Sequence, residues 1–330
     1  MLLALVCALL PVLAGPAQAA GRGAGRAYVG NDGSVSVLDV AKHTVVATIP
    51  AAYGIRDVAV NAAGTRVYTA DHGMGTYSVI NTATNTVIGT VDVPGQPTGV
   101  AVSPNGRKVY GTRTGGVDVI DTATNALVTT ITGVGIEPFA VQFSPDGGRA
   151  YVPSLESGVV AVIDTASSTV ITLVGVGGRP RNVAVAPDGS RVYVVSISPA
   201  TVSVIDTATN TVTATISVGE LAYGIGVSPD GSRLYVTGHL AGGGAGLVIV
   251  DTATNTVTAT RDLGSGGTGL DVDADPTGRV VYVVQRESKQ VSVLHAVTGV
   301  LIAEVPVGSS PHRLAFGPPR RCRPATPQHR

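Results

Sequence analysis

The sequence predicts an all-β, seven-bladed β-propeller with four antiparallel strands in each blade. The first observation is an Arg-x-Tyr-Val string, or a close variant, that returns every 40 to 47 residues. A period near this length fits one propeller blade. The second is that each repeat holds four apolar, β-branched runs separated by turn residues. The seven repeats are marked by Tyr28, Tyr68, Tyr110, Tyr151, Tyr193, Tyr235 and Tyr282.

One complete repeat shows the predicted strands, which we name B, C, D and A in chain order, with A innermost. Strands B, C and D cover residues 191–195, 201–206 and 211–218, and strand A begins at Gly224. Ser228-Pro229-Asp230-Gly231 then carries the residues of a type I turn, because proline is pre-set for its second position and glycine suits its end. This turn joins A to the next B.

An acidic or amide residue follows strand C in most repeats. Repeated carboxylates resemble a ligand set, but an Asx side chain at this place accepts a backbone N–H two residues on and closes the turn. The sequence therefore predicts a structural role for Asp39, Asn81, Asp121, Asp164, Asp206 and Asp251. His295 occupies the same place in the last repeat, where we interpret it as a substituted turn residue.

The two ends of the repeat region are complementary, which is the third observation. The first unit opens on strand B at Ala27-Tyr28 and lacks an A strand, while the last A strand, at 313–316, has no following B. Exposed strand edges invite unwanted pairing. We therefore expect the C-terminal strand to complete the N-terminal blade and close the ring.

Composition restricts the classes of function. Charged residues make up 13% of the chain and the formal net charge is zero, which argues against nucleic-acid binding, since that needs a basic face. Aromatic residues make up 4% and tryptophan is absent, so Val, Ile, Leu and Ala must form the core.

The predicted domains are a signal peptide over 1–19, a linker over 20–25, the propeller over 26–317 and a disordered basic Pro/Arg tail over 318–330. Residues 2–10 are apolar and Ala17-Gln18-Ala19 forms a cleavage site, although no Lys or Arg precedes them. The alternative is a short membrane anchor. We expect a secreted or cell-surface protein with no transmembrane segment in the mature chain. With Cys7 in the signal and Cys322 in the tail, no disulfide is expected within the domain.

The repeat resembles the YVTN family of β-propeller repeats. The resemblance rests on Tyr193-Val194, Tyr235-Val236-Thr237, the V-S-V-I-D string of 202–206, D-T-A-T-N-T and S-P-D-G. It covers residues 26 to about 317. It implies a secreted or surface propeller of bacteria or archaea and indicates little about activity.

The candidate site comes from the positions where the repeat varies. Length varies in the B–C loops, which share one face with the D–A loops, whereas the A–B and C–D turns stay constant. The residue two before the first apolar residue of strand A should lie at the mouth of the central channel, a favoured place for ligands. These candidate ligand-binding residues are Arg56, Thr98, Phe139, Arg181, Tyr223, Thr268 and His312.

These residues favour a secreted, non-enzymatic binding propeller for a protein, a carbohydrate or a small anionic ligand. No catalytic set can be assembled from local motifs, and no cofactor is expected. The alternative is a lactonase-like or lyase-like enzyme that uses His312 with Arg56 or Arg181, and Glu137 as the acid. An electron-transfer or cofactor carrier is the third class.

Metal sites have weak support in the sequence. His72 and His239 lie on the variable face but in blades that are not adjacent, and metal ligands must converge. The alternating aspartates Asp271, Asp273 and Asp275 fit either a calcium loop or a widened A–B turn. They lack the glycine and glutamate of an EF-hand, so we expect the turn.

Overall fold

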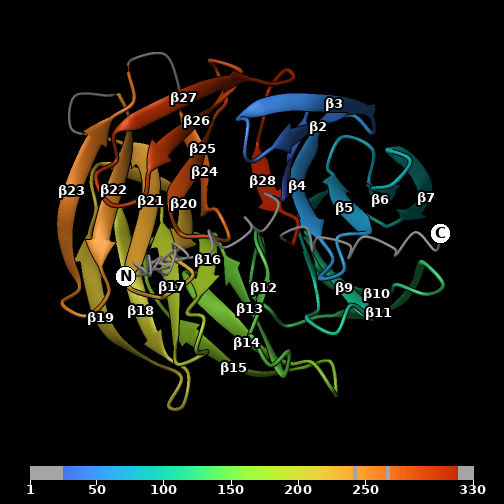
Figure 1. Ribbon diagram of the computed structural model, residues 1–330. Helices are drawn as coiled ribbons and strands as arrows, with labels where there is room; N and C mark the ends of the chain where they lie inside the picture. The colour runs from blue at the N-terminus through green and yellow to red at the C-terminus, as the bar shows by residue number, and fades with distance from the viewer. Residues whose placement is uncertain (1–24, 241–243, 265–267, 319–330) are drawn as a thin grey trace, which may run out of the picture.

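The computed structural model describes residues 25–240, 244–264 and 268–318. These residues form seven four-stranded antiparallel sheets around a central channel, with the predicted A strand of each sheet nearest the centre (Figure 1). The seven-bladed propeller is thereby confirmed, and no helix occurs in the described residues. The described residues therefore contain no helix that could cross a membrane. The predicted signal peptide and residues 319–330 lie outside the described residues.

The first four blades are given from the innermost strand outward. Blade 1 contains β28 (Arg313–Phe316), β1 (Arg26–Asn31), β2 (Ser34–Asp39) and β3 (Thr44–Pro50). Blade 2 contains β4 (Ile55–Val60), β5 (Arg66–Asp71), β6 (Thr76–Asn81) and β7 (Thr86–Asp92). Blade 3 contains β8 (Pro97–Val102), β9 (Lys108–Arg113), β10 (Gly116–Asp121) and β11 (Ala126–Ile131). Blade 4 contains β12 (Gln142–Phe143), β13 (Arg149–Ser154), β14 (Val159–Asp164) and β15 (Thr169–Gly175).

The remaining three blades follow the same order. Blade 5 contains β16 (Pro180–Val185), β17 (Arg191–Ser196), β18 (Thr201–Asp206) and β19 (Thr211–Ser217). Blade 6 contains β20 (Leu221–Val227), β21 (Arg233–His239), β22 (Ala245–Asp251) and β23 (Thr256–Asp262). Blade 7 contains β24 (Gly269–Ala274), β25 (Val280–Gln285), β26 (Gln290–His295) and β27 (Leu301–Pro306).

The ring closes through the C-terminal strand, as predicted. β28 pairs antiparallel with β1, with Val29 opposite Leu314 and Tyr28 opposite Ala315. Two backbone bonds extend this ladder, from His312 N to Gly30 O and from Gly317 N to Arg26 O. The pairing thus covers the inner edge of β1.

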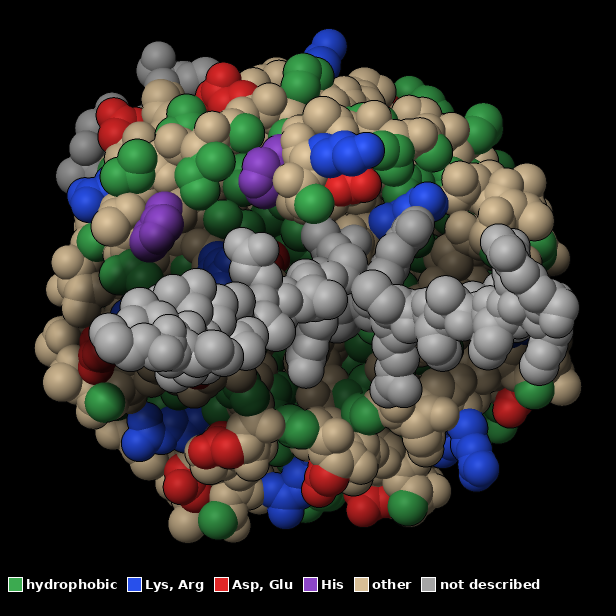
Figure 2. All heavy atoms as spheres, in the orientation of Figure 1, with side chains coloured by type: hydrophobic (Ala, Val, Ile, Leu, Met, Phe, Trp, Pro, Cys, Tyr) green, Lys and Arg blue, Asp and Glu red, His purple; other side chains and the backbone are tan. Residues whose placement is uncertain are grey.

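The core lies between the blades. Each apolar cluster joins residues of two neighbouring sheets; one, for example, packs Val29 of blade 1 against Val284 and Val293 of blade 7. The seven repeat tyrosines are all buried in these interfaces. Burial of both sheet faces explains why the strands read as continuous apolar runs. On the face that Figure 2 shows, charged side chains of the two signs are interspersed.

The residues of the Asp-Thr-Ala-Thr-Asn motif stabilise the C–D turn. In blade 5, Asp206 Oδ1 accepts the backbone N–H groups of Ala208 and Thr209, at 3.0 and 2.9 Å. Thr207 Oγ1 donates to Gly189 O of the A–B turn at 2.7 Å. Asn210 takes a φ of 54°, a conformation that asparagine tolerates better than most residues. His295 Nδ1 accepts two backbone N–H groups in the same place in blade 7, as expected.

The arginine of the Arg-x-Tyr-Val string links neighbouring blades. Arg191 of blade 5 donates from Nη1 to Thr252 O in the C–D turn of blade 6, at 2.9 Å. Arg66 makes the equivalent bond to Thr122, and Lys108 to Thr165. A basic residue stands at this position in the first six repeats, which fits a role in assembly of the ring.

Asp206→Ala should lower the free energy of unfolding by about 1 kcal/mol, because two backbone N–H groups lose their acceptor. Asp206→Asn should cost less, since Asn81 already makes this turn in blade 2. Urea unfolding of both variants measures the difference. Equal losses for alanine and asparagine would contradict the turn assignment.

Candidate functional site

Seven side chains, one from each blade, lie at the end of the channel where the B–C and D–A loops meet. Strand register defines the equivalent position in each blade. It directly follows the strand A residue that pairs with the end of strand B; Ile55 pairs with Asp71 in blade 2, for example, and Gly269 with Gln285 in blade 7. We call this ring the channel mouth, and its members are Arg56, Thr98, Phe139, Arg181, Tyr223, Leu270 and His312.

Six of these residues are those that the sequence analysis selected, and the seventh differs. In blade 7 the mouth position is held by Leu270, and Thr268 precedes the strand. Thr268 Oγ1 instead lies 3.3 Å from His239 Nε2 and 3.2 Å from a carboxylate oxygen of Glu287. The sequence analysis took the residue two before the first apolar residue of strand A. In blade 7 the first apolar residue, Leu270, itself occupies the mouth position.

Arg181 is held between two aromatic rings of the mouth. Its guanidinium carbon lies 4.9 Å from the ring centre of Phe139 and 5.1 Å from that of Tyr223. Such cation–π contacts favour a flat cation over an aromatic face. Burial, together with the charge of Arg313, lowers the pKa of Arg181 to about 9.

The mouth concentrates positive charge around one histidine. Burial and the charges of Arg56, Arg286, Arg181 and Arg313 lower the pKa of His312 to about 3. The imidazole is therefore neutral at physiological pH. Burial and the neighbouring Arg286 also lower the pKa of Arg56. Arg286 was missed because it comes from the B–C loop after β25, outside the repeat position that the sequence analysis compared.

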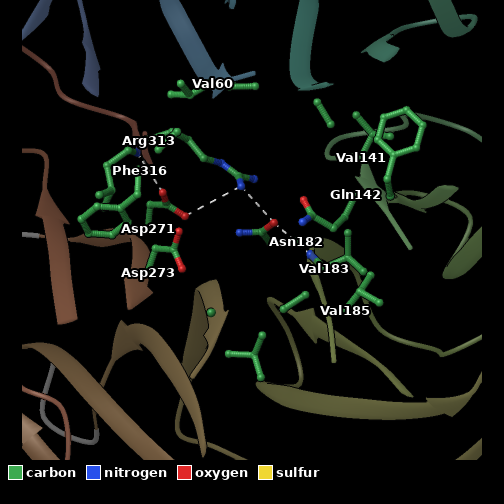
Figure 3. Close-up of a pocket in the computed structure, with 18 of the residues that line it drawn as sticks. Val60, Val141, Gln142, Asn182, Val183, Val185, Asp271, Asp273, Arg313 and Phe316 are labelled. Carbon is green, nitrogen blue, oxygen red and sulfur yellow. Dashed lines mark hydrogen bonds and ion pairs between the residues drawn. The ribbon is translucent and has the colours of Figure 1, made fainter. Parts of the chain in front are cut away.

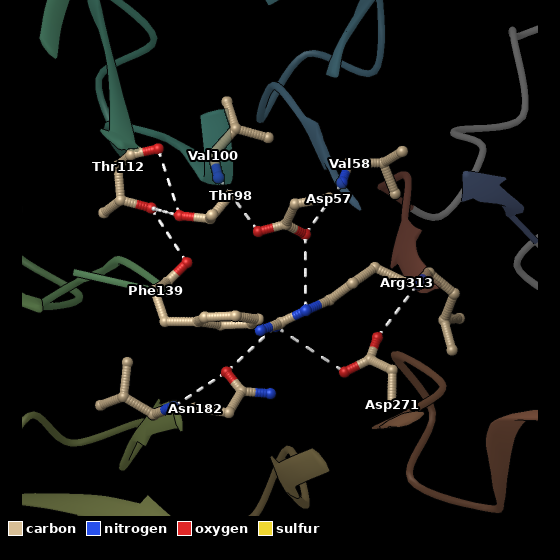
Figure 4. Close-up of polar contacts among 11 residues, drawn as sticks. Asp57, Val58, Thr98, Val100, Thr112, Phe139, Asn182, Asp271 and Arg313 are labelled. Carbon is tan, nitrogen blue, oxygen red and sulfur yellow. Dashed lines mark hydrogen bonds and ion pairs between the residues drawn. The ribbon is translucent and has the colours of Figure 1, made fainter. Parts of the chain in front are cut away.

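Thr98 has a structural role at the mouth. Its Oγ1 lies 3.0 Å from Thr112 Oγ1 (Figure 4). It also lies 3.0 Å from Pro138 O, which joins blade 3 to blade 4. A hydroxyl engaged in this way has little capacity left for a ligand.

Of the residues of the alternative enzyme hypothesis, His312, Arg56 and Arg181 meet at the mouth, whereas no side-chain bond or ion pair joins Glu137 to them within the described residues. Glu137 is exposed on the D–A loop of blade 4, and its backbone oxygen accepts a hydrogen bond from Leu155 N. His72 lies against Pro97 O and His239 against Tyr223 and Thr268, so the two histidines have different neighbours. A histidine with a pKa near 3 is also a weak general base, because an efficient base has a pKa near the working pH.

A polar bridge crosses the channel beneath the mouth. Arg313 of β28 donates from Nη1 to Asn182 Oδ1 of β16 at 3.0 Å (Figure 4). It lies 3.8 Å from Asp57 of β4 and 3.8 Å from Asp271 of β24. One side chain thus contacts four blades, counting its own. We call Arg313, Asp57, Asn182 and Asp271 the Arg313 bridge.

Both carboxylates of the bridge also join adjacent blades through the backbone. Asp57 accepts Val100 N of blade 3 and Asp271 accepts Leu314 N of blade 1, each at 3.0 Å. Burial raises the pKa of Asp57 to about 6 and raises that of Asp271, while Arg313 opposes both shifts.

The alternating aspartates of blade 7 serve three different places. Asp271 belongs to the Arg313 bridge, and Asp273 lines the channel further along. Asp275 accepts the backbone N–H groups of Thr277, Arg279 and Val280. The expected widening of this A–B turn is wrong: Gly278 N bonds Asp275 O at 2.8 Å, as Gly231 N bonds Ser228 O in blade 6. An aspartate has replaced the first serine of the turn without changing its length.

A protein-family model matches most of the propeller. The model of the cytochrome D1 heme domain matches residues 103–317. The chain belongs to the cytochrome D1 heme domain family. This agrees with the predicted propeller repeat, while the finer resemblance to YVTN repeats stays an expectation. No curated protein matches this member of the family.

Solved structures share the fold of this cytochrome D1 heme domain family member. Hydrazine synthase from Kuenenia stuttgartiensis matches with a TM-score of 0.74 and 20% identity, over 87% of this chain and 99% of that one. A protein of unknown function from Desulfotomaculum acetoxidans matches with a TM-score of 0.77 and 16% identity, over 90% and 100%. The dihydro-heme d1 dehydrogenase NirN, solved in complex with DHE, matches with a TM-score of 0.67 and 16% identity, over 91% and 76%.

Proposed function

We propose that this protein is an exported, non-enzymatic binding propeller that holds a carboxylate-bearing ligand at its channel mouth. One observation carries the proposal. Arg56, Arg181 and Arg286 gather around the neutral His312, and none of the three has an ion pair with a described residue.

The energetics of the mouth favour an anion. Partly buried cations that face one another repel and lack the hydration of an exposed side chain. A carboxylate placed among them relieves the repulsion, and a guanidinium can bind it through two parallel N–H bonds.

The donor set also fits the ligand that the family name suggests, a haem. A haem has a flat apolar ring with carboxylate side chains, and its iron accepts a neutral imidazole as an axial ligand. Arg56 and Arg286 would hold the carboxylates. Low basicity keeps His312 deprotonated, the form that a metal requires. Bound there, the haem would supply an iron centre, while the protein binds and orients it.

Titration of the full mature chain with hemin tests the proposal through the Soret absorbance. Arg56→Ala with Arg286→Ala should weaken binding at least tenfold, because a hydrogen bond to a charged group contributes about 1.5–3 kcal/mol. His312→Ala should alter the Soret band itself, because the imidazole that would bind the iron is lost. Arg107→Ala with Arg279→Ala, two exposed arginines of A–B turns, is the matched control.

Two results would count against the mouth. Loss of binding in the control pair with full binding in the mouth pair would move the site to the other face. Equal binding of iron-free protoporphyrin, with no effect of His312→Ala, would keep the anion site and exclude iron ligation.

Export is the second part of the proposal and has its own test. The mature protein from a secreting bacterial host should begin at Ala20, directly after the Ala17-Gln18-Ala19 site. N-terminal sequencing of the purified protein decides this. A membrane-bound product that retains Met1 would favour the anchor.

A further inference from the structure

The channel has a second compartment on the opposite side of the Arg313 bridge from the mouth. It is a cavity of about 640 Å³, lined by all seven inner strands, and we call it the channel cavity (Figure 3). Its volume lies within the range of small-molecule sites, about 300–1,000 Å³. Exposed prolines of the A–B turns line its outer end, so it opens on the face away from the mouth. These are Pro104, Pro145, Pro229 and Pro276.

The lining of the channel cavity combines polar groups with aliphatic side chains, and its floor is polar. Valine and alanine side chains of the inner strands, such as Val60, Val141 and Val185, form the walls. The Arg313 bridge forms the floor. Figure 3 shows Asp271 and Asp273 on one side, facing Asn182 and Gln142 across the cavity.

Two polar groups at the floor lack partners within the protein. Asn182 is 2% exposed, and its carbonyl oxygen accepts from Val183 N and from Arg313, but its Nδ2 donates to no described residue. Asp273 accepts Ala274 N through Oδ1, and its Oδ2 has no bond to a described residue. The floor therefore presents one unused donor and one unused anionic acceptor.

The charges that face the cavity are predominantly negative. The ionisable residues of its lining are Asp57, Asp271, Asp273 and Arg313, so three acids face one base. Asp57 and Asp271 already share Arg313 and backbone N–H groups. Asp273 is the carboxylate left for an external cation. The valine and alanine side chains among the lining residues can contact the carbon skeleton of an organic cation, whereas a bare metal ion needs several converging oxygens.

We propose that the channel cavity binds a small organic ammonium ion that also carries a hydroxyl or carbonyl oxygen. The ammonium group pairs with Asp273, and the oxygen accepts the N–H of Asn182. The carbon chain between them contacts the valine and alanine walls. This site is separate from the mouth in position and in the charge of its ligand.

Binding at this site depends on pH. Burial, and the charge of Asp271 beside it, raise the pKa of Asp273 to about 7, with Asp275 adding to the shift. Arg313 and Asp57 complete the charged groups of the lining. Since the ionised form pairs with an ammonium group, affinity should rise between about pH 6 and about pH 8, where alkylamines stay protonated.

The test uses the full mature chain and three probes of one length. Aminobutanol, with its amine and hydroxyl at opposite ends, carries the cation; butanediol is neutral and hydroxybutanoate is anionic. Isothermal titration, supported by ligand-observed NMR, should detect the amino alcohol and at least tenfold weaker binding of both other probes. The affinity of aminobutanol should increase as the pH rises.

Variants distinguish the floor from the rest of the molecule. Asp273→Asn keeps the shape and the bond to Ala274 N but removes the charge, so aminobutanol should bind at least tenfold more weakly and without pH dependence. Asp188→Asn, in an exposed A–B turn outside the lining, should bind as the parent does. Arg56→Ala with Arg286→Ala should also leave this affinity unchanged, which separates the result from the mouth.

Three outcomes would overturn the site. One is butanediol binding as tightly as aminobutanol. Another is full affinity in Asp273→Asn, with a native melting curve for the variant. The third is no binding of aminobutanol at about 10 mM, a concentration at which a weak millimolar complex is populated.

Discussion

A chain that ends at Ser310 should lose its cooperative unfolding transition or melt far below the full-length protein, and it should aggregate. The truncation removes β28, which is the inner strand of blade 1. Its loss exposes the edge of β1. It also removes Leu314 from the interface between blades 1 and 7, and Arg313 from the channel. The combined loss approaches the whole stability of a domain, about 5–15 kcal/mol. Thermal unfolding with light scattering measures both effects.

A second truncation is the control. A chain that ends at Pro318 keeps β28 and its ladder and loses residues 319–330, so it should melt close to the parent. If the Ser310 truncation also melts like the parent and stays soluble, strand β28 does not close the ring in the way described.

Arg313→Met should lower the free energy of unfolding by about 3–5 kcal/mol at neutral pH. Methionine fills similar space without the charge, so Asp57 and Asp271 stay buried without their cation. Arg313 holds both pKa values below the level that burial alone would produce. Its removal therefore raises them further above the value of an unfolded aspartate, about 3.9. Urea unfolding at several pH values measures the effect.

The sign of the pH dependence follows from linkage. A carboxylate whose folded-state pKa is raised contributes its stability fully below the unfolded pKa, and loses it as the pH rises through the folded value. The variant should therefore be closest to the parent at about pH 4 and fall further behind towards about pH 8. Adding Asp57→Asn and Asp271→Asn to Arg313→Met should recover much of the loss at neutral pH. A loss of equal size at every pH would contradict the charge argument.

The repeat made most of the architecture predictable. Tyr28 through Tyr282 mark the blades because each tyrosine fills the same interface between sheets, and Asp206 marks a turn because a local side chain satisfies local N–H groups. Ring closure could be inferred since an unpaired B strand and an unpaired A strand were the two ends of one pattern. Six of the seven mouth residues followed from the same position in each repeat.

The register of blade 7 and the contents of the channel could not be predicted in this way. Leu270 takes the mouth position in place of Thr268 because strand pairing, and not the first apolar residue, sets the register. A signal for the bridge was nevertheless present. One residue beyond the mouth position, the polar residues Asp57, Asn182, Asp271 and Arg313 interrupt strands that are otherwise apolar.

The sequence by itself therefore determined the seven blades, their closure, their turns and the face that carries the variable loops. These features depend on interactions within one repeat or between neighbouring repeats, and their spacing is visible along the chain. Only the tertiary structure decided that Arg313 reaches Asn182, that Arg286 joins Arg56 beside His312, and that a cavity lies below the bridge. Those contacts cross the channel or come from loops of variable length. Their formation depends on how seven blades converge on one axis, and this geometry cannot be inferred from the residues of a single repeat.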